Sequence, residues 1–113
     1  MPVFQLQTNV SKIPDNFLSE TTNFIADILG KPASYVMVMV HSGECMSMGG
    51  TTEPCGHVHL GSIGCVGKGV NSKHTQKIAA YLNEKLGIPA DRLYCMFENV
   101  DAHNCGLGGK TFG

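Results

Sequence analysis

The chain has 113 residues, of which 42% are hydrophobic and 15% charged, and its formal net charge is −1. A domain of this length buries enough surface to fold without disulfide or metal cross-links. The lack of a basic excess argues against a nucleic-acid partner. The longest run of aliphatic residues and methionines, Val36 to Val40, is too short to span a membrane.

The composition also bears on the cellular compartment. The first residues lack the charged and apolar regions of a secretory signal, so we expect a cytoplasmic protein. The cysteines are Cys45, Cys55, Cys65, Cys95 and Cys105, an odd number with no Cys-x-x-C pair. We therefore expect them to be reduced.

An internal repeat organises the chain. Leu29 to Ala33 and Leu86 to Ala90 share the pattern Leu-Gly-x-Pro-Ala, and the offset from Leu29 to Leu86 is 57 residues. Twice this offset is close to the full length. The repeat predicts one domain, residues 1–113, made of two copies of a supersecondary unit, at about 1–57 and 58–113.

The first copy has the pattern strand, helix, strand. Residues 2–8 alternate loosely and predict a strand. Asp15 is a candidate N-cap for a helix that Gly30 and Pro32 terminate. Residues 35–40 are β-branched and apolar, which predicts a buried strand whose methionines belong to the core. The expected inner face of the helix consists of Leu18, Thr22, Ile25, Ile28 and Leu29.

The second copy repeats this order. Residues 58–66 predict a strand, and Asn71 or Ser72 is the candidate N-cap of a second helix. Gly87 ends that helix, and residues 92–97 predict the last long strand. The expected inner face of the helix consists of Thr75, Ile78, Ala79, Leu82 and Leu86.

These elements define an α/β (α+β) fold class. A helix that joins two strands of one sheet makes them parallel, with a right-handed crossover. Two such units predict a four-stranded mixed sheet with both helices on one face. The segments 45–50 and 104–112 are short and glycine-containing, and we expect edge pieces or turns. The opposite face of the sheet lacks a cover, and a further subunit is the expected one.

Several short segments carry a family resemblance from end to end of the chain. They are Met1–Phe4, Pro14–Glu20, Gly30–Pro32 with Tyr35 beyond, Gly49–Cys55, Ser62–Gly64, Asp91–Tyr94 and Thr111–Phe112. With these segments the chain resembles the macrophage migration inhibitory factor family of the tautomerase superfamily. The resemblance implies that family's tautomerase-like fold, a duplicated strand-helix-strand unit assembled as a homotrimer.

The resemblance also implies an activity. The family implies a cofactor-independent isomerase, a keto-enol tautomerase of the phenylpyruvate tautomerase and L-dopachrome isomerase type. Phenylpyruvate-like and dopachrome-like compounds are the implied substrates. The alternative is a cytokine-like signalling ligand, secreted without a signal peptide, that engages a cell-surface receptor and has an incidental tautomerase pocket.

Pro2 is the catalytic residue that the resemblance implies, once Met1 has been removed. A tautomerase needs a base whose pKa is close to working pH, and an α-amine has an ordinary value near 8. Burial and a nearby cation, for which Lys31 is the candidate, lower such a pKa. With Met1 attached, the Pro2 nitrogen is an amide and has no basicity.

The substrate-binding residues are likewise implied by the resemblance. Lys31 holds the substrate carboxylate, and Tyr94 comes from a neighbouring subunit. Met96 stands where the vertebrate pattern has Asn, and Leu107 replaces a Trp, so the substrate range is expected to differ. The remaining implied pocket residues are Tyr35, Ser62, Ile63, Cys105 and Phe112.

A metal site is the third alternative. Cys55, His57 and His59 alternate and so share one face of a strand, and thiol and imidazole ligands suit zinc or copper. His41 could add another ligand. A tetrahedral site usually shows two closely spaced ligand pairs, whereas one cluster is visible. We therefore favour ordinary packing and expect no metal and no cofactor.

Overall fold

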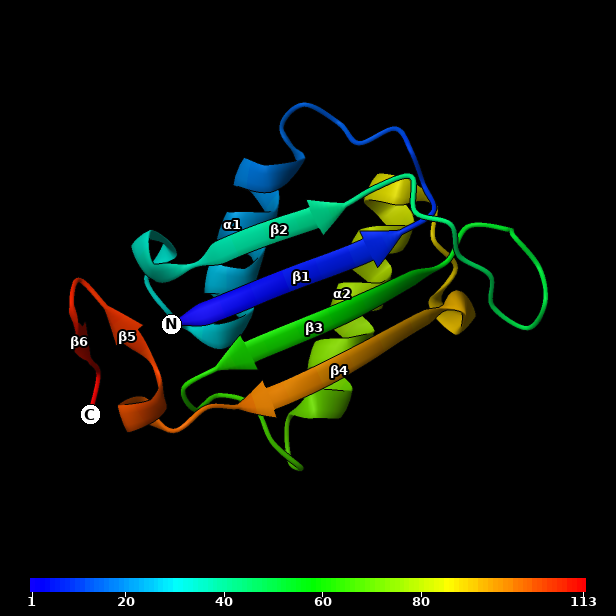
Figure 1. Ribbon diagram of the computed structural model, residues 1–113. Coiled ribbons are helices and arrows are strands. Elements are labelled where there is room, and N and C mark those ends of the chain that lie inside the picture. The colour runs from blue at the N-terminus through cyan, green and yellow to red at the C-terminus, as the bar shows by residue number, and fades with distance from the viewer.

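The computed structural model describes residues 1–113 and contains two strand-helix-strand units (Figure 1). The first unit comprises β1 (Pro2–Thr8), α1 (Phe17–Leu29) and β2 (Met37–His41). The second comprises β3 (Gly56–Ser62), α2 (Asn71–Leu86) and β4 (Leu93–Asn99). Two very short strands, β5 (Gly106–Leu107) and β6 (Lys110–Thr111), form a hairpin close to the C-terminus.

The four long strands form one mixed sheet in the order β2-β1-β3-β4. Within each unit the strands are parallel, whereas the central pair, β1 and β3, is antiparallel. Both helices lie behind this sheet in Figure 1, on one face. The predicted α/β sheet is therefore confirmed.

The core lies between the sheet and the helices. Alternate residues of the central strands, among them Phe4 and Leu60, are fully buried against the helices. Ile25 of α1 and Leu82 of α2 are buried from the other side. Burial of such side chains is the dominant stabilising contribution, about 2 kcal/mol for each.

The start of α1 differs from the prediction. Asn16, and not Asp15, is the N-cap, and it makes no side-chain capping bond. The buried face includes Phe17 and Thr21, whereas Leu18 is 53% exposed. The first half of the expected inner face of α1 was therefore wrong by one residue. Phe17 and Leu18 satisfy the helical spacing equally well.

The start of α2 also differs. The N-cap is Val70, so neither Asn71 nor Ser72 holds that place. Asn71 instead accepts a hydrogen bond from the backbone N–H of Gly67 at 2.8 Å and closes the preceding turn. The buried face includes His74, which the apolar pattern omitted, whereas Thr75 is half-buried.

The predicted ends of the helices are correct. Gly30 and Gly87 have φ values of +64° and +72° and terminate α1 and α2. In this left-handed region glycine avoids the steric penalty of a Cβ atom.

Two strand predictions need correction. The strand expected at 35–40 is preceded by a 3-10 turn at Ala33–Tyr35 and begins at Met37. It is an edge strand, and its methionines lie on the face without helices and not in the core. The strand expected at 58–66 ends at Ser62, because Gly64 and Cys65 adopt positive φ and turn the chain.

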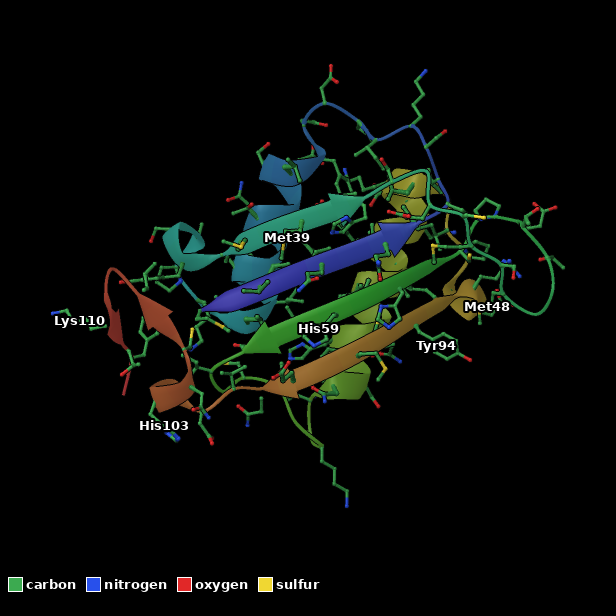
Figure 2. All side chains as sticks on the ribbon, in the orientation of Figure 1. Met39, Met48, His59, Tyr94, His103 and Lys110 are labelled. Carbon is green, nitrogen blue, oxygen red and sulfur yellow. The ribbon has the colours of Figure 1, made fainter.

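The other face of the sheet is left open by the helices, as expected. Figure 2 shows Met39, His59 and Tyr94 on this face. Met96 is 53% exposed there, and Tyr94 is 62% exposed. Such exposed apolar side chains favour an interaction surface. His59 lies 3.2 Å from the Glu98 carboxylate on the same face.

The loop between β2 and β3 is held by two polar side chains. Arg92 donates hydrogen bonds of 3.0–3.2 Å to four of its carbonyl oxygens, those of Met48, Thr51, Glu53 and Pro54. The amide of Asn9 makes three more bonds, to Thr52, Glu53 and Cys55. Asn9 and Arg92 thereby fix the loop from β1 on one side and from the start of β4 on the other.

Candidate active site

Pro2 is the first residue of β1 and is buried. It lies opposite Ser62, the last residue of β3, in the antiparallel pairing of the two central strands. Both side chains belong to the alternation that faces the helices. Pro2 therefore stands at one end of the sheet, and Met1 is the residue that covers its nitrogen.

Two hollows meet at Met1. The first, of about 160 Å³, is largely apolar, and the second, of about 340 Å³, contains Lys31. Met1, Tyr35 and Phe112 line both hollows. The first is completed by Val3, Met37, Cys105, Gly106 and Leu107. The second is completed by Lys31, Pro32, Ile63 and Ala102. Met1 thus lies between the two spaces, whereas Pro2 itself lines neither of them.

Lys31 is positioned by the end of α1. The turn at Gly30 carries it to the sheet end, where its ammonium donates a hydrogen bond of 3.1 Å to the carbonyl oxygen of Ile63. The pKa of the Met1 amine is lowered, first by desolvation and then by the Lys31 cation, while Cys105 and Cys65 oppose the shift. This place in the structure therefore disfavours a protonated amine.

The turn after β3 is fixed from three sides. The backbone N–H of Gly64 donates to the side chain of Asn99 at 3.0 Å, and Lys31 holds Ile63. The Nε2 atom of His74 lies 2.8 Å from the carbonyl oxygen of Cys65. A carbonyl oxygen can only accept, so Nε2 carries the hydrogen. Cys65 has a φ of +63°, which is uncommon for a residue other than glycine.

Aromatic side chains form one wall. The rings of Tyr35 and Phe112 meet edge to face, with centroids 6.1 Å apart. Tyr35 belongs to the 3-10 turn before β2, and Phe112 follows the terminal hairpin, which the backbone bond from Phe112 to Cys105 at 3.0 Å holds closed. Two segments distant in sequence thus enclose the same space.

Most of the residues implied by the resemblance therefore gather at this end of the sheet. The side chains that line the two hollows include Lys31, Tyr35, Ile63, Cys105 and Phe112. Leu107 joins them, and Ser62 lies beside Pro2.

Tyr94 and Met96 do not join the site within one chain. Tyr94 is paired with His57, near the start of β4, whereas the site lies where that strand ends. Figure 2, in the orientation of Figure 1, shows Tyr94 at the end of the sheet opposite to the one where Figure 1 marks the N-terminus. A contribution of Tyr94 to a pocket of this kind therefore requires another subunit.

Five lining residues were not anticipated as part of the site from the sequence, namely Val3, Met37, Pro32, Ala102 and Gly106. The pairing of Val3 with Met37 in neighbouring strands brings the first two together. Strand alternation places both side chains on the open face. This alternation is the sequence signal that could have identified them as lining residues. No local pattern marks Ala102.

The structure does not bring Cys55, His57 and His59 together as metal ligands. Cys55 precedes β3 and is buried, whereas the two histidines are half-buried on the open face. No three His, Cys, Asp or Glu side chains are grouped so that they could hold a metal ion. Neither α1 nor α2 has the length and apolar character of a membrane-crossing helix.

Chemically, the site combines an N-terminal amine, one cation and apolar walls. Such an arrangement suits an anionic substrate with an apolar body, held next to a base of low proton affinity.

The known proteins to which the chain is similar belong to one family. The family model for macrophage migration inhibitory factor matches residues 1–113. A macrophage migration inhibitory factor homolog of Brugia malayi is 41% identical, with 100% of both chains covered. The macrophage migration inhibitory factor of Xenopus laevis is 39% identical, with 99% of both chains covered. The solved structure of the Trichinella spiralis factor superposes with a TM-score of 0.94 at 39% identity, over 97% of this chain and 99% of that one. The chain therefore belongs to the macrophage migration inhibitory factor family, within the tautomerase superfamily.

Proposed function

We propose that the protein is a cofactor-independent keto-enol tautomerase whose base is the amine of Pro2 after removal of Met1. The position of Pro2 carries the proposal. It is the second residue of the chain, it is buried at a sheet end, and the hollows lined by the preceding residue, Met1, contain one cation. Family membership supports an isomerase of this general type.

The proposed reaction moves one proton from carbon to oxygen. The lone pair of the Pro2 nitrogen takes a proton from the carbon next to the substrate carbonyl. The electrons of that C–H bond form the carbon–carbon double bond, and the carbonyl π electrons move to oxygen. The resulting ammonium then returns a proton to that oxygen, which gives the enol and regenerates the amine. The reverse sequence converts enol to ketone.

The environment of the N-terminus supports a neutral amine. Desolvation and Lys31 both lower the pKa of the amine that Met1 carries at this site. The Pro2 nitrogen is one residue further along, and we infer that the same two causes act on it once Met1 is removed. Each unit of reduction in pKa requires only about 1.4 kcal/mol.

The substrates are proposed to be phenylpyruvate-like and dopachrome-like compounds. Their carboxylate would bind the Lys31 ammonium, with Ile63 beside it. Their rings would contact the apolar wall that includes Tyr35 and Phe112. Tyr94 and Met96 would reach this pocket from a neighbouring subunit of a homotrimer, since both are exposed on β4. Leu107 offers a thinner wall than an aromatic residue.

The test is the Pro2→Gly variant, assayed for enolisation of phenylpyruvate. Intact mass first establishes whether Met1 is absent from the wild-type protein. We expect activity in the Met1-free wild type, and a loss of at least about a hundredfold in the variant, since general base catalysis contributes this much. A matched thermal melt controls for folding. Unchanged turnover in Pro2→Gly would refute the mechanism.

A signalling role is the second candidate, and the names of the relatives favour it. The matched proteins of Xenopus and of parasitic nematodes are called macrophage migration inhibitory factor or homologs of it. The proposal places the protein in the cytoplasm, with release from cells that needs no signal peptide. Binding of the Met1-free protein to a receptor ectodomain, retained in Pro2→Gly, would support this role, and absence of binding would refute it.

A further inference from the structure

Ser62 carries a buried hydroxyl group that has no hydrogen-bond partner. The residue is 0% exposed, and its Oγ atom is shielded from solvent and has no hydrogen-bond partner in the protein. A buried hydroxyl without a partner destabilises the folded state. An unpaired group of this kind in a native structure therefore calls for an explanation.

The other buried hydroxyls in the chain are all paired. Thr8, at the far end of β1, donates to the carbonyl oxygen of Cys55 at 2.7 Å and accepts from the N–H of Val10 at 3.1 Å. The hydroxyl of Thr21 lies 2.9 Å from that of Tyr81. Among the buried hydroxyls, the one without a partner is thus the one at the end of the sheet where the N-terminus lies.

The register of the sheet places Ser62 next to Pro2. The two residues are directly opposite in the antiparallel pair of β1 and β3, and both side chains are buried on the side of the helices. Opposite residues on one face have Cβ atoms about 5 Å apart. The orphan hydroxyl therefore lies beside the ring that contains the Pro2 nitrogen.

Removal of Met1 changes what this nitrogen can do. In the Met1-bearing chain it is a tertiary amide without a hydrogen, so it offers Ser62 no donor. In the Met1-free chain it is a secondary amine, with one N–H when neutral and two when protonated. Processing therefore creates a hydrogen-bond donor beside the one buried hydroxyl that lacks a partner.

We propose that Ser62 is a positioning residue whose hydroxyl oxygen accepts a hydrogen bond from the Pro2 amine in the Met1-free chain. This inference rests on the proposed function, because it assigns Ser62 a role toward the proposed base. When the N–H of the neutral amine is directed to Ser62 on the core side, the lone pair is directed to the opposite side. That side is where the two hollows meet.

The bond has a measurable electrostatic consequence. A hydrogen bond from a charged donor is about twice as strong as one from a neutral donor. Ser62 would therefore stabilise the ammonium form and raise the pKa of the amine, against the effects of burial and Lys31. Ser62→Ala should lower that pKa by about one unit, which moves the acid limb of the kcat/KM profile to lower pH.

The first test compares Ser62→Ala in two forms of the protein. The form that retains Met1 is made in a host without methionine aminopeptidase. In this form the variant should melt at the wild-type temperature or above, because it loses only an unpaired hydroxyl. In the Met1-free form it should melt about 4 °C lower, because it loses a hydrogen bond. The matched control, Thr8→Val, should lower both melting temperatures equally.

The second test titrates the Pro2 amine by NMR on protein with ¹⁵N-labelled proline. It needs no turnover, so it separates this inference from the proposed function. A lower amine pKa in Ser62→Ala supports the inference even if Pro2→Gly remains active. An unchanged amine pKa, with a melting effect independent of Met1, overturns it even if Pro2 is the base. Ser62→Cys, which is similar in size and a weak hydrogen-bonding group, replaces Ser62→Ala if the latter fails to fold.

Discussion

The Nζ atom of Lys31 lies 3.1 Å from the carbonyl oxygen of Ile63, which joins the end of α1 to the turn that follows β3. Each repeat contributes one partner to this contact. The single cation of the candidate site is thereby held at the end of the sheet where Pro2 begins β1.

Removal of the Lys31 charge tests its role in substrate binding. Lys31→Met should raise KM for a keto acid by about tenfold or more, since charge-assisted bonds are strong. It should also move the acid limb of the kcat/KM profile to higher pH, because the cation lowers the amine pKa. Steady-state kinetics across pH provides both readouts.

Lys31→Arg is the matched control, since it keeps the charge. A second control is an enolisable ketone without a carboxylate, whose KM should change little. Equal losses for charged and uncharged substrates would contradict a carboxylate-binding role.

Tyr94 should act across a subunit boundary. It lies at the opposite end of the sheet from Pro2, so a pocket containing both requires two chains. Pro2→Gly and Tyr94→Ala variants should each have low activity. After mixing, mild dissociation and reassembly, hybrid oligomers with complete sites should be more active than either parent. No gain after verified subunit exchange would refute a shared site.

Arg92 should stabilise the protein through the loop between β2 and β3. Its guanidinium donates to four carbonyl oxygens of that loop. Arg92→Ala should lower the free energy of unfolding by about 2 kcal/mol, which corresponds to a fall of roughly 10 °C in Tm. Thermal melts measure this effect, with the exposed Lys68 changed to Ala as the control. A fall of similar size in both variants would be inconsistent with the role of Arg92.

We expect the half-buried thiol of Cys95 to make the folded protein less stable at alkaline pH. Burial raises the pKa of its thiol from 9.0 to about 11. Below pH 9 the folded and unfolded states both keep the proton, so stability does not depend on this group. Between about pH 9 and 11 the unfolded chain releases the proton while the folded chain retains it, so stability falls as pH rises.

Denaturant unfolding at pH 8 and pH 10 tests this expectation. Cys95→Ala should show a smaller decrease between the two pH values than the wild type. The exposed Cys45 provides the control, since Cys45→Ala should leave the decrease unchanged. Identical decreases in the wild type and in Cys95→Ala would exclude the thiol as the cause.

The sequence was sufficient for the order and type of the long elements. Gly30 and Gly87 lie in the two copies of the Leu-Gly-x-Pro-Ala pattern, which is a short sequence signal. In the structure both helices end at these glycines. Local sequence could not decide whether Phe17 or Leu18 belongs to the inner face of α1, because both fit the helical spacing. The sheet decides it, since the helix docks with Phe17 against the core.

The candidate site was predictable only where the family resemblance supplied it. The contact between Lys31 and Ile63 joins residues 32 positions apart, and no periodicity indicates it. The unpaired hydroxyl of Ser62 likewise depends on the register of two strands and on burial. These are tertiary properties, whereas a sequence pattern reports the preferences of neighbouring residues.

Because β1 and β3 are antiparallel, equivalent positions of the two repeats lie at opposite ends of the sheet and have different roles. Their equivalent ends point in opposite directions, so the repeat partner of Lys31, the fully buried Ile88, lies away from the amine. Substitutions near Ile88 should therefore be detected as losses of expression and thermal tolerance. Those near Lys31 should leave a well-behaved protein with altered turnover, so a mutational scan should give different effects at the two ends of the sheet.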